Sequence, residues 1–206
     1  MGYESPMPVQ EEVIPFLLGD DNDVIALAQT GTGKTAAFGL PILQKIDVTT
    51  YHPQALVLCP TRELCLQIAD DLNDYSKYID NLKVLPVYGG SSIESQIKTL
   101  KRGVHVVVAT PGRLLDLMNR KTVDLSLVKN VIMDEADEML NMGFTDSINA
   151  ILAEVPENRN MLLFSATMPK EIANITKKYM KNPKEIVIGN KNEGNKNIRD
   201  IYYMVQ

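Results

Sequence analysis

A glycine-rich segment with an adjacent lysine and hydroxyl group could bind phosphate. Ala28-Gln29-Thr30-Gly31-Thr32-Gly33-Lys34-Thr35 follows an apolar run and precedes a helical pattern. Glycines let a loop turn its backbone N–H groups inward, and the N-terminus of the next helix adds a positive dipole. Lys34 would then contact the β- and γ-phosphates, and the Thr35 hydroxyl would ligate Mg²⁺. The usual pattern begins with glycine where this sequence has Ala28, and a plain glycine turn is the alternative.

Two adjacent acids, Asp134 and Glu135, could act on the bound phosphate. They follow the apolar run Val131-Ile132-Met133, so a buried strand would deliver both to one edge of a sheet. Asp134 would hold the metal through a bound water, and Glu135 would orient or deprotonate an attacking water. Helix N-termini also favour acids, which is the structural alternative. With the phosphate loop, the pair indicates a catalytic set of Lys34, Asp134 and Glu135.

The elements that must position these residues alternate between short apolar runs and longer amphipathic ones. The strands expected are Val24–Ala28, Ala55–Cys59, Val84–Val87, Val104–Ala109, Val131–Asp134, Met161–Phe164 and Ile186–Ile188. The helices expected are Glu11–Leu18, Thr35–Ile46, Glu63–Tyr78, Ile93–Lys101, Arg113–Asn119, Thr145–Glu154 and Lys170–Met180. Repeated strand–helix units predict an α/β fold with a parallel sheet between helices, and ligands of such sheets bind beyond the carboxyl ends of the strands.

Size, charge and cysteine usage set limits on the function. The 206 residues suit one domain, and the net charge of −5 with a pI near 5.1 argues against strong independent binding to nucleic acid. The two cysteines, Cys59 and Cys65, suit reduced packing residues better than a disulfide or zinc site. No apolar run is long enough to cross a membrane and no secretion signal is visible, so we expect a cytoplasmic protein. We also expect it to be a monomer.

The order of the motifs resembles that of the DEAD-box RNA helicases. Asp134-Glu135-Ala136-Asp137 spells the family's signature, and alanine at the first position of the phosphate loop is normal in the family. The further matches, which extend over most of the chain, are Ser5-Pro6-Met7-Pro8-Val9-Gln10, Pro60-Thr61-Arg62-Glu63-Leu64, Gly89-Gly90, Thr110-Pro111-Gly112-Arg113 and Ser165-Ala166-Thr167. The resemblance implies a RecA-like domain that binds ATP and Mg²⁺ and works on RNA.

The same resemblance assigns roles to single residues. Gln10 would read the adenine edge, provided that its neighbours hold its rotamer, and Gln29 to Thr35 would hold the phosphates. Contacts to the RNA backbone would come from Pro60, Thr61, Arg62, Gly90, Thr110, Pro111, Gly112 and Arg113. Coupling of hydrolysis to strand separation would involve Asp137, Ser165, Ala166 and Thr167. The alternatives are structural: Arg113 could pair with Asp116, Gly89-Gly90 could be a plain turn, and Ser165 and Thr167 could cap a helix ahead of Pro169.

The domain organisation follows from one shift in composition. Residues 1–188 read as the ATP-binding domain, and Gly189–Asn197 reads as a polar linker. Ile198–Val205 is prone to form a strand, and we expect it to be disordered or docked on a sheet edge. The resemblance implies a second domain that carries the arginine fingers, and an aromatic residue upstream of Gln10 that stacks on adenine. Other P-loop proteins such as kinases and GTPases, and an ATP-gated RNA clamp, are the competing functions.

Overall fold

A parallel sheet of seven strands forms the centre of the computed structural model, which describes residues 5–19, 23–29, 31 and 33–188. The order across the sheet is β3-β4-β2-β5-β6-β1-β7, and every neighbouring pair is parallel. The strands are β1 (Val24–Leu27), β2 (Ala55–Leu58), β3 (Val84–Val87), β4 (Val106–Ala109), β5 (Asn130–Met133), β6 (Asn160–Ser165) and β7 (Lys184–Val187). The predicted α/β fold with a parallel sheet is confirmed, and each expected strand is present.

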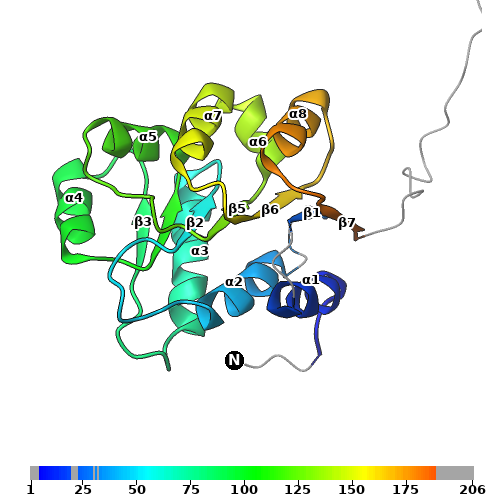
Figure 1. The fold of residues 1–206 in the computed structure, drawn as a ribbon, viewed down its shortest axis with the longest axis horizontal. Helices are drawn as coiled ribbons and strands as arrows, with labels where there is room; N and C mark the ends of the chain where they lie inside the picture. The colour runs from blue at the N-terminus through cyan, green and yellow to red at the C-terminus, as the bar shows by residue number, and fades with distance from the viewer. Residues whose placement is uncertain (1–4, 20–22, 30, 32, 189–206) are drawn as a thin grey trace, which may run out of the picture.

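Helices cover both faces of the sheet, which explains the continuous apolar strands. Figure 1 shows α1 (Pro8–Gly19), α2 (Lys34–Gln44) and α3 (Arg62–Tyr75) on one side of the row of strands. The other side carries α5 (Pro111–Asn119), α6 (Ala136–Asn141), α7 (Thr145–Glu154) and α8 (Lys170–Tyr179), and α4 (Ile93–Arg102) lies beside β3. In β2, β4 and β5 all four residues are buried.

Alternate residues of each central strand enter two separate cores. On β2, Leu56 and Leu58 pack with the α5–α8 layer, whereas Ala55 and Val57 pack with the α1–α3 layer. In the second core Phe38 of α2 contacts Phe164 of β6, with ring centroids 5.6 Å apart. Full burial of such a side chain stabilises a fold by about 1.5–3 kcal/mol. These contacts hold the start of α2 against the end of β6, so the phosphate loop and the Ser165 segment rest on one core.

Two details differ from the sequence expectations. Helix α1 begins at Pro8, so Gln10 lies inside its first turn and does not precede it, because Pro is well tolerated where a helix starts. Helix α6 was not expected, because six residues are too few to show a helical repeat.

Cys59 and Cys65 are buried and unpaired, as predicted. Among the described residues, no helix has both the length and the apolar character needed to cross a bilayer. The predicted linker and tail, 189–206, lie outside the described residues.

Candidate functional site

The sheet order places the predicted motifs other than Ser5–Gln10 along one edge, at the carboxyl ends of the strands. Following the sheet from β3 to β1, the segments that leave the strands are Gly89-Gly90, Thr110–Arg113, Pro60–Arg62, Asp134–Asp137, Ser165–Thr167 and the phosphate loop. Backbone hydrogen bonds continue the ladder beyond the strands: Thr110 N donates to Val87 O, and Ala28 N donates to Ser165 O. The predicted RNA residues therefore lie at one end of this edge and the phosphate loop lies towards the other.

Lys34 and Asp134 meet at the centre of the predicted phosphate site. The Lys34 ammonium lies 3.1 Å from Asp134 Oδ1, and both side chains are almost fully buried. Lys34 opens α2, and Gly33 before it has a φ of 77°, a backbone angle that glycine adopts without strain. The two motifs thus share one charged pair at the start of a helix, where backbone N–H groups also point outward. Thr30 and Thr32 of the loop lie outside the described residues.

Gln10 is held against the phosphate loop. Its Nε2 donates to Gly33 O at 3.2 Å, and its Oε1 accepts a bond from Met7 N at 2.9 Å. A side chain at position 33 would come within 2.5 Å of Gln10 Nε2, so only glycine allows this contact. The amide has two donor hydrogens and two acceptor lone pairs. One donor and one acceptor therefore remain for a ligand, and the rotamer is held by neighbours, as adenine recognition requires.

Glu135 has an unusual backbone conformation next to the metal-binding candidate. Its φ is 51° and its ψ is 52°, in the left-handed region that few residues other than glycine enter. Burial raises the pKa of Glu135, the charge of Asp134 raises it further, and Lys34 opposes both. The backbone N–H of Glu135 donates to Asp134 Oδ1 at 3.0 Å. Strained residues of this kind are held by their surroundings and are concentrated at functional sites.

Asp134 and Thr35 are the candidate metal ligands of the site. Burial raises the pKa of Asp71 on α3, and the nearby Thr35 hydroxyl opposes this rise. A hydroxyl that donates its hydrogen to a carboxylate keeps two lone pairs on its oxygen, so Thr35 can still face a metal ion. Within the described residues only Oδ1 of Asp134 is bonded, to Lys34 and Glu135, and Oδ2 remains available. A carboxylate oxygen in this position suits Mg²⁺ or a water bound to it.

Asp137 connects the acidic motif to the segment after β6. Its Oδ2 accepts hydrogen bonds from Thr167 N at 3.1 Å and from Thr167 Oγ1 at 2.8 Å. Its own backbone N–H donates to Ser165 Oγ at 3.3 Å. Ser165 and Thr167 therefore bind the first turn of α6, and they do not cap α8, whose N-cap Pro169 has no side-chain bond. A displacement of Asp137 would therefore move or break its hydrogen bonds with Ser165 and Thr167.

The predicted RNA residues form a second group. The Arg62 guanidinium lies over the Tyr88 ring, 5.0 Å from its centroid, and Gly90 has a φ of 82° close to Arg62. Thr61 caps α3 by accepting a bond from Leu64 N, and Pro111 is the first residue of α5, with Gly112 next to it. The side chain of Thr110 makes no capping bond although it precedes α5.

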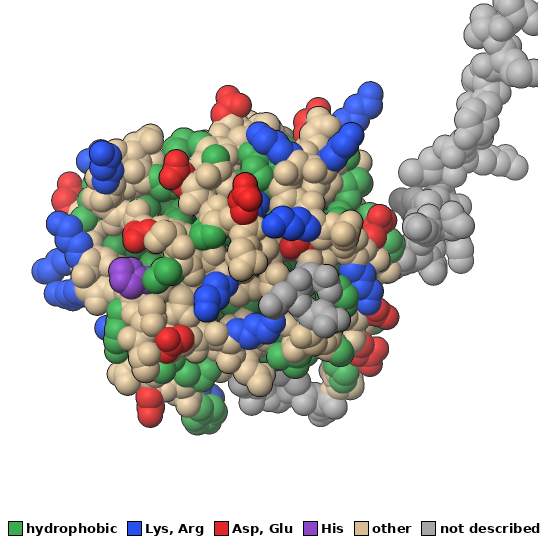
Figure 2. Space-filling view, in the orientation of Figure 1, with side chains coloured by type: hydrophobic (Ala, Val, Ile, Leu, Met, Phe, Trp, Pro, Cys, Tyr) green, Lys and Arg blue, Asp and Glu red, His purple; other side chains and the backbone are tan. Residues whose placement is uncertain are grey.

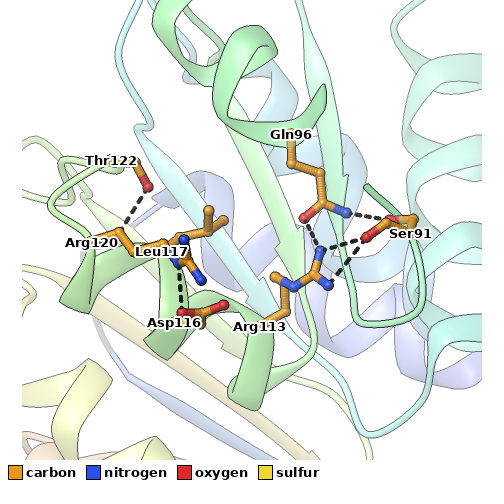
Figure 3. Close-up of polar contacts among 7 residues, drawn as sticks. All are labelled: Ser91, Gln96, Arg113, Asp116, Leu117, Arg120 and Thr122. Atoms are coloured by element: carbon orange, nitrogen blue, oxygen red, sulfur yellow. Dashed lines mark hydrogen bonds and ion pairs between the residues drawn. The ribbon is translucent and has the colours of Figure 1, made fainter. Parts of the chain in front are cut away.

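Arg113 holds the Gly90 segment in place and does not pair with Asp116. Its guanidinium donates twice to Ser91 O, at 3.2 Å each, and once to Gln96 Oε1 at 3.0 Å (Figure 3). Gln96 in turn donates to Ser91 Oγ at 2.8 Å. Asp116 pairs with Arg120 one turn further along the helix, so the alternative of an Arg113–Asp116 pair is wrong. The contact of Tyr88 with Arg62 and these contacts of Gln96 were not predicted, because neither Tyr88 nor Gln96 belongs to a sequence motif.

Comparisons with known proteins agree with this arrangement. The sequence model described as "DEAD/DEAH box helicase" matches residues 7–175. The "ATP-dependent RNA helicase DeaD" of Mycobacterium tuberculosis H37Rv is 51% identical over 205 residues, which cover 100% of this chain and 36% of the relative. The protein of the same name from Escherichia coli K12 is 50% identical over 188 residues, covering 91% and 30%. The chain thus spans about a third of the length of these relatives.

Solved structures show the same fold. The crystal structure of a DEAD box protein from the hyperthermophile Methanococcus jannaschii has a TM-score of 0.86 and 46% identity, and it covers 90% of this chain and 50% of that one. A hypothetical ATP-dependent RNA helicase from Sulfolobus tokodaii has a TM-score of 0.83 and 44% identity, covering 91% and 54%. The expected RecA-like fold is confirmed.

Proposed function

Because the chain belongs to the DEAD/DEAH box helicase family, we propose that it is the ATP-binding part of an RNA-stimulated ATPase that unwinds short duplexes. In this proposal a second helicase domain completes the site, and the two together are called the two-domain protein below. The observation that carries the proposal is the 3.1 Å contact between Lys34 and Asp134, on the sheet edge that also holds the Arg62 and Gly90 segments. This contact supports a phosphate-binding group and a metal-binding group next to a separate surface for RNA.

Each group of the site has a chemical task. Lys34 neutralises charge on the β- and γ-phosphates, and the open end of α2 supplies backbone donors. Glu135 accepts the proton of the attacking water, and its raised pKa makes it a stronger base than an ordinary glutamate. Asp134 and Thr35 would hold Mg²⁺. When bound, the ion would neutralise charge on the phosphates.

RNA contact depends on local donors because the whole chain is acidic. The net charge is −5, and Figure 2 shows basic and acidic side chains interspersed over most of the visible face. Arg62 and the backbone around Gly90 would meet the sugar–phosphate backbone, which carries no sequence information. Arg113 supports them by holding Ser91 and Gln96. We therefore expect weak RNA binding by this chain alone, with little sequence preference.

Replacing Gln10 with alanine should reduce the preference for adenine. The change removes the donor and acceptor that face the ligand, so ADP affinity should fall about three- to tenfold, the effect of one or two hydrogen bonds. GDP affinity should change less, and calorimetry on both nucleotides measures the ratio. Gln44→Ala, at the exposed end of α2, is the matched control. An unchanged ADP to GDP ratio would remove Gln10 from adenine recognition.

Replacing Arg62 with alanine should weaken RNA binding by the two-domain protein about tenfold, because a charge-assisted hydrogen bond to phosphate is lost. Fluorescence anisotropy with a labelled single strand and a non-hydrolysable ATP analogue measures the loss. The salt dependence should also become less steep. The control is Arg120→Ala, which removes an exposed arginine already paired with Asp116. Equal losses in both variants would mean that Arg62 acts only through net charge.

A further inference from the structure

A polar hollow lies on the opposite edge of the sheet from the nucleotide loop. It has a volume of about 760 Å³ and opens where β1, β2, β5 and β6 begin. Its lining includes Asp23, Lys45, Lys129, Asn130, Arg159 and Lys181. Volumes of this size are typical of small-molecule sites. Because every motif described above lies at the carboxyl ends of the strands or against the phosphate loop, the hollow is independent of the ATP and RNA surfaces.

The hollow is locally basic in an acidic protein. Four of the residues just named carry positive charge and one carries negative charge. The single acid, Asp23, is buried, and its two oxygens accept backbone N–H bonds from Met161 at 2.7 Å and Lys181 at 2.6 Å. In the part of the chain that the structure describes, neither Lys129 nor Lys181 forms an ion pair. The charges of Lys129 and Lys181 are therefore open to an anionic ligand.

Two side-chain donors of the hollow lack partners among the described residues, and one of them, Arg159 Nε, is fully buried. Asn130 is only 8% exposed, and its side-chain amide makes no hydrogen bond to any residue that the structure describes. The Nε of Arg159 is fully buried and has no partner among those residues either, while its other nitrogens donate to Pro156 O and Tyr179 O. Buried polar groups are nearly always bonded, so such exceptions call for an explanation. A ligand that brings acceptor oxygens would bond the Asn130 amide and lie next to the Arg159 guanidinium.

We propose that this hollow binds a small molecule carrying two or more phosphate groups, either inorganic or attached to an organic group. Phosphate oxygens accept from the planar guanidinium of an arginine and from lysine ammonium groups at once. A continuous RNA strand fits less well. Asp47 and Glu157 are next to lining residues in the sequence, and their negative charges would repel a phosphodiester chain that extended beyond the hollow.

The test uses nuclear magnetic resonance on the 206-residue chain, with tripolyphosphate as the probe. We expect the side-chain amide of Asn130 and the Nε–H of Arg159 to shift along one saturable curve, which locates binding away from the Lys34 loop. Lys129→Gln combined with Lys181→Gln should weaken this binding about fivefold or more, since two charges are removed. Both lysines are exposed, so the fold should be kept. Lys98→Gln, on the exposed face of α4, should leave the curve unchanged.

Three results would overturn the proposal. The first is the absence of a saturable shift at Asn130 and Arg159. The second is an equal loss of affinity in the Lys98→Gln control, which would mean a diffuse charge effect. In the third, single-stranded RNA shifts these resonances and tripolyphosphate does not, which would make the hollow a nucleic-acid contact. If ADP shifts them as well, a nucleotide is an organic source of the phosphate groups, and the proposal holds.

Discussion

The 206-residue chain alone should hydrolyse ATP about 10³–10⁵-fold more slowly than the two-domain protein with RNA, the range typical for loss of an arginine finger. The described arginines are placed for other tasks. Arg62 lies over Tyr88, Arg113 holds Ser91, and Arg120 pairs with Asp116. Arg102, at the end of α4 just before β4 begins, and Arg159 lie at the opposite edge of the sheet. Among the described residues none is thus available to stabilise the charge that develops on the γ-phosphate.

Phosphate release measured with and without RNA checks this expectation. The chain alone should give a low rate that RNA does not change, and the two-domain protein should give a rate that RNA raises. A two-domain protein carrying Lys34→Ala is the control for contaminating ATPases. RNA-stimulated turnover by the chain alone at the rate of the two-domain protein would contradict the need for a second domain.

Replacing Glu135 with glutamine in the two-domain protein should lower turnover about 10²–10⁴-fold, the usual contribution of a general base. ADP affinity should stay within about twofold, since the amide keeps the shape of the side chain and the Lys34–Asp134 pair is untouched. Glu138→Gln, an exposed acid on the same short helix, should leave turnover unchanged. Normal turnover in Glu135→Gln would mean that another group takes the proton.

The pH profile gives a second readout of the same residue. Burial and Asp134 raise the pKa of Glu135, and only the deprotonated carboxylate can act as a base. Turnover should therefore fall as the pH drops through this raised pKa, at a higher pH than for an ordinary glutamate. The acid limb should be absent from the residual activity of Glu135→Gln.

Local patterns in the sequence were enough to predict the sheet and the position of the two proposed nucleotide motifs at its edge. The strands are continuous apolar runs because both sheet faces are covered, and the phosphate loop is one uninterrupted segment. Contacts between distant segments were not predictable in this way. The contacts of Arg113 with Ser91 and Gln96 depend on how α4 and α5 pack. The resemblance to the family implied the same contact with RNA for Arg62 and Arg113. Only the structure shows that the two arginines have different neighbours.

The backbone conformation of Glu135 was not predictable from the sequence either. Its left-handed conformation has no signal in the residue type, because glutamate has no special preference for it. The same holds for the hollow at the opposite edge, whose basic residues come from segments far apart in the sequence.

Calorimetric titration of the 206-residue chain with ADP and Mg²⁺ tests the central claim most directly. We predict saturable binding to one strong site, weakened about tenfold or more in Lys34→Ala, where a charge-assisted contact to phosphate is lost. Lys98→Ala, which removes an exposed lysine of α4, should bind as the unmodified chain does. Equal affinity of the unmodified chain and Lys34→Ala for ADP would contradict the assignment of the nucleotide site.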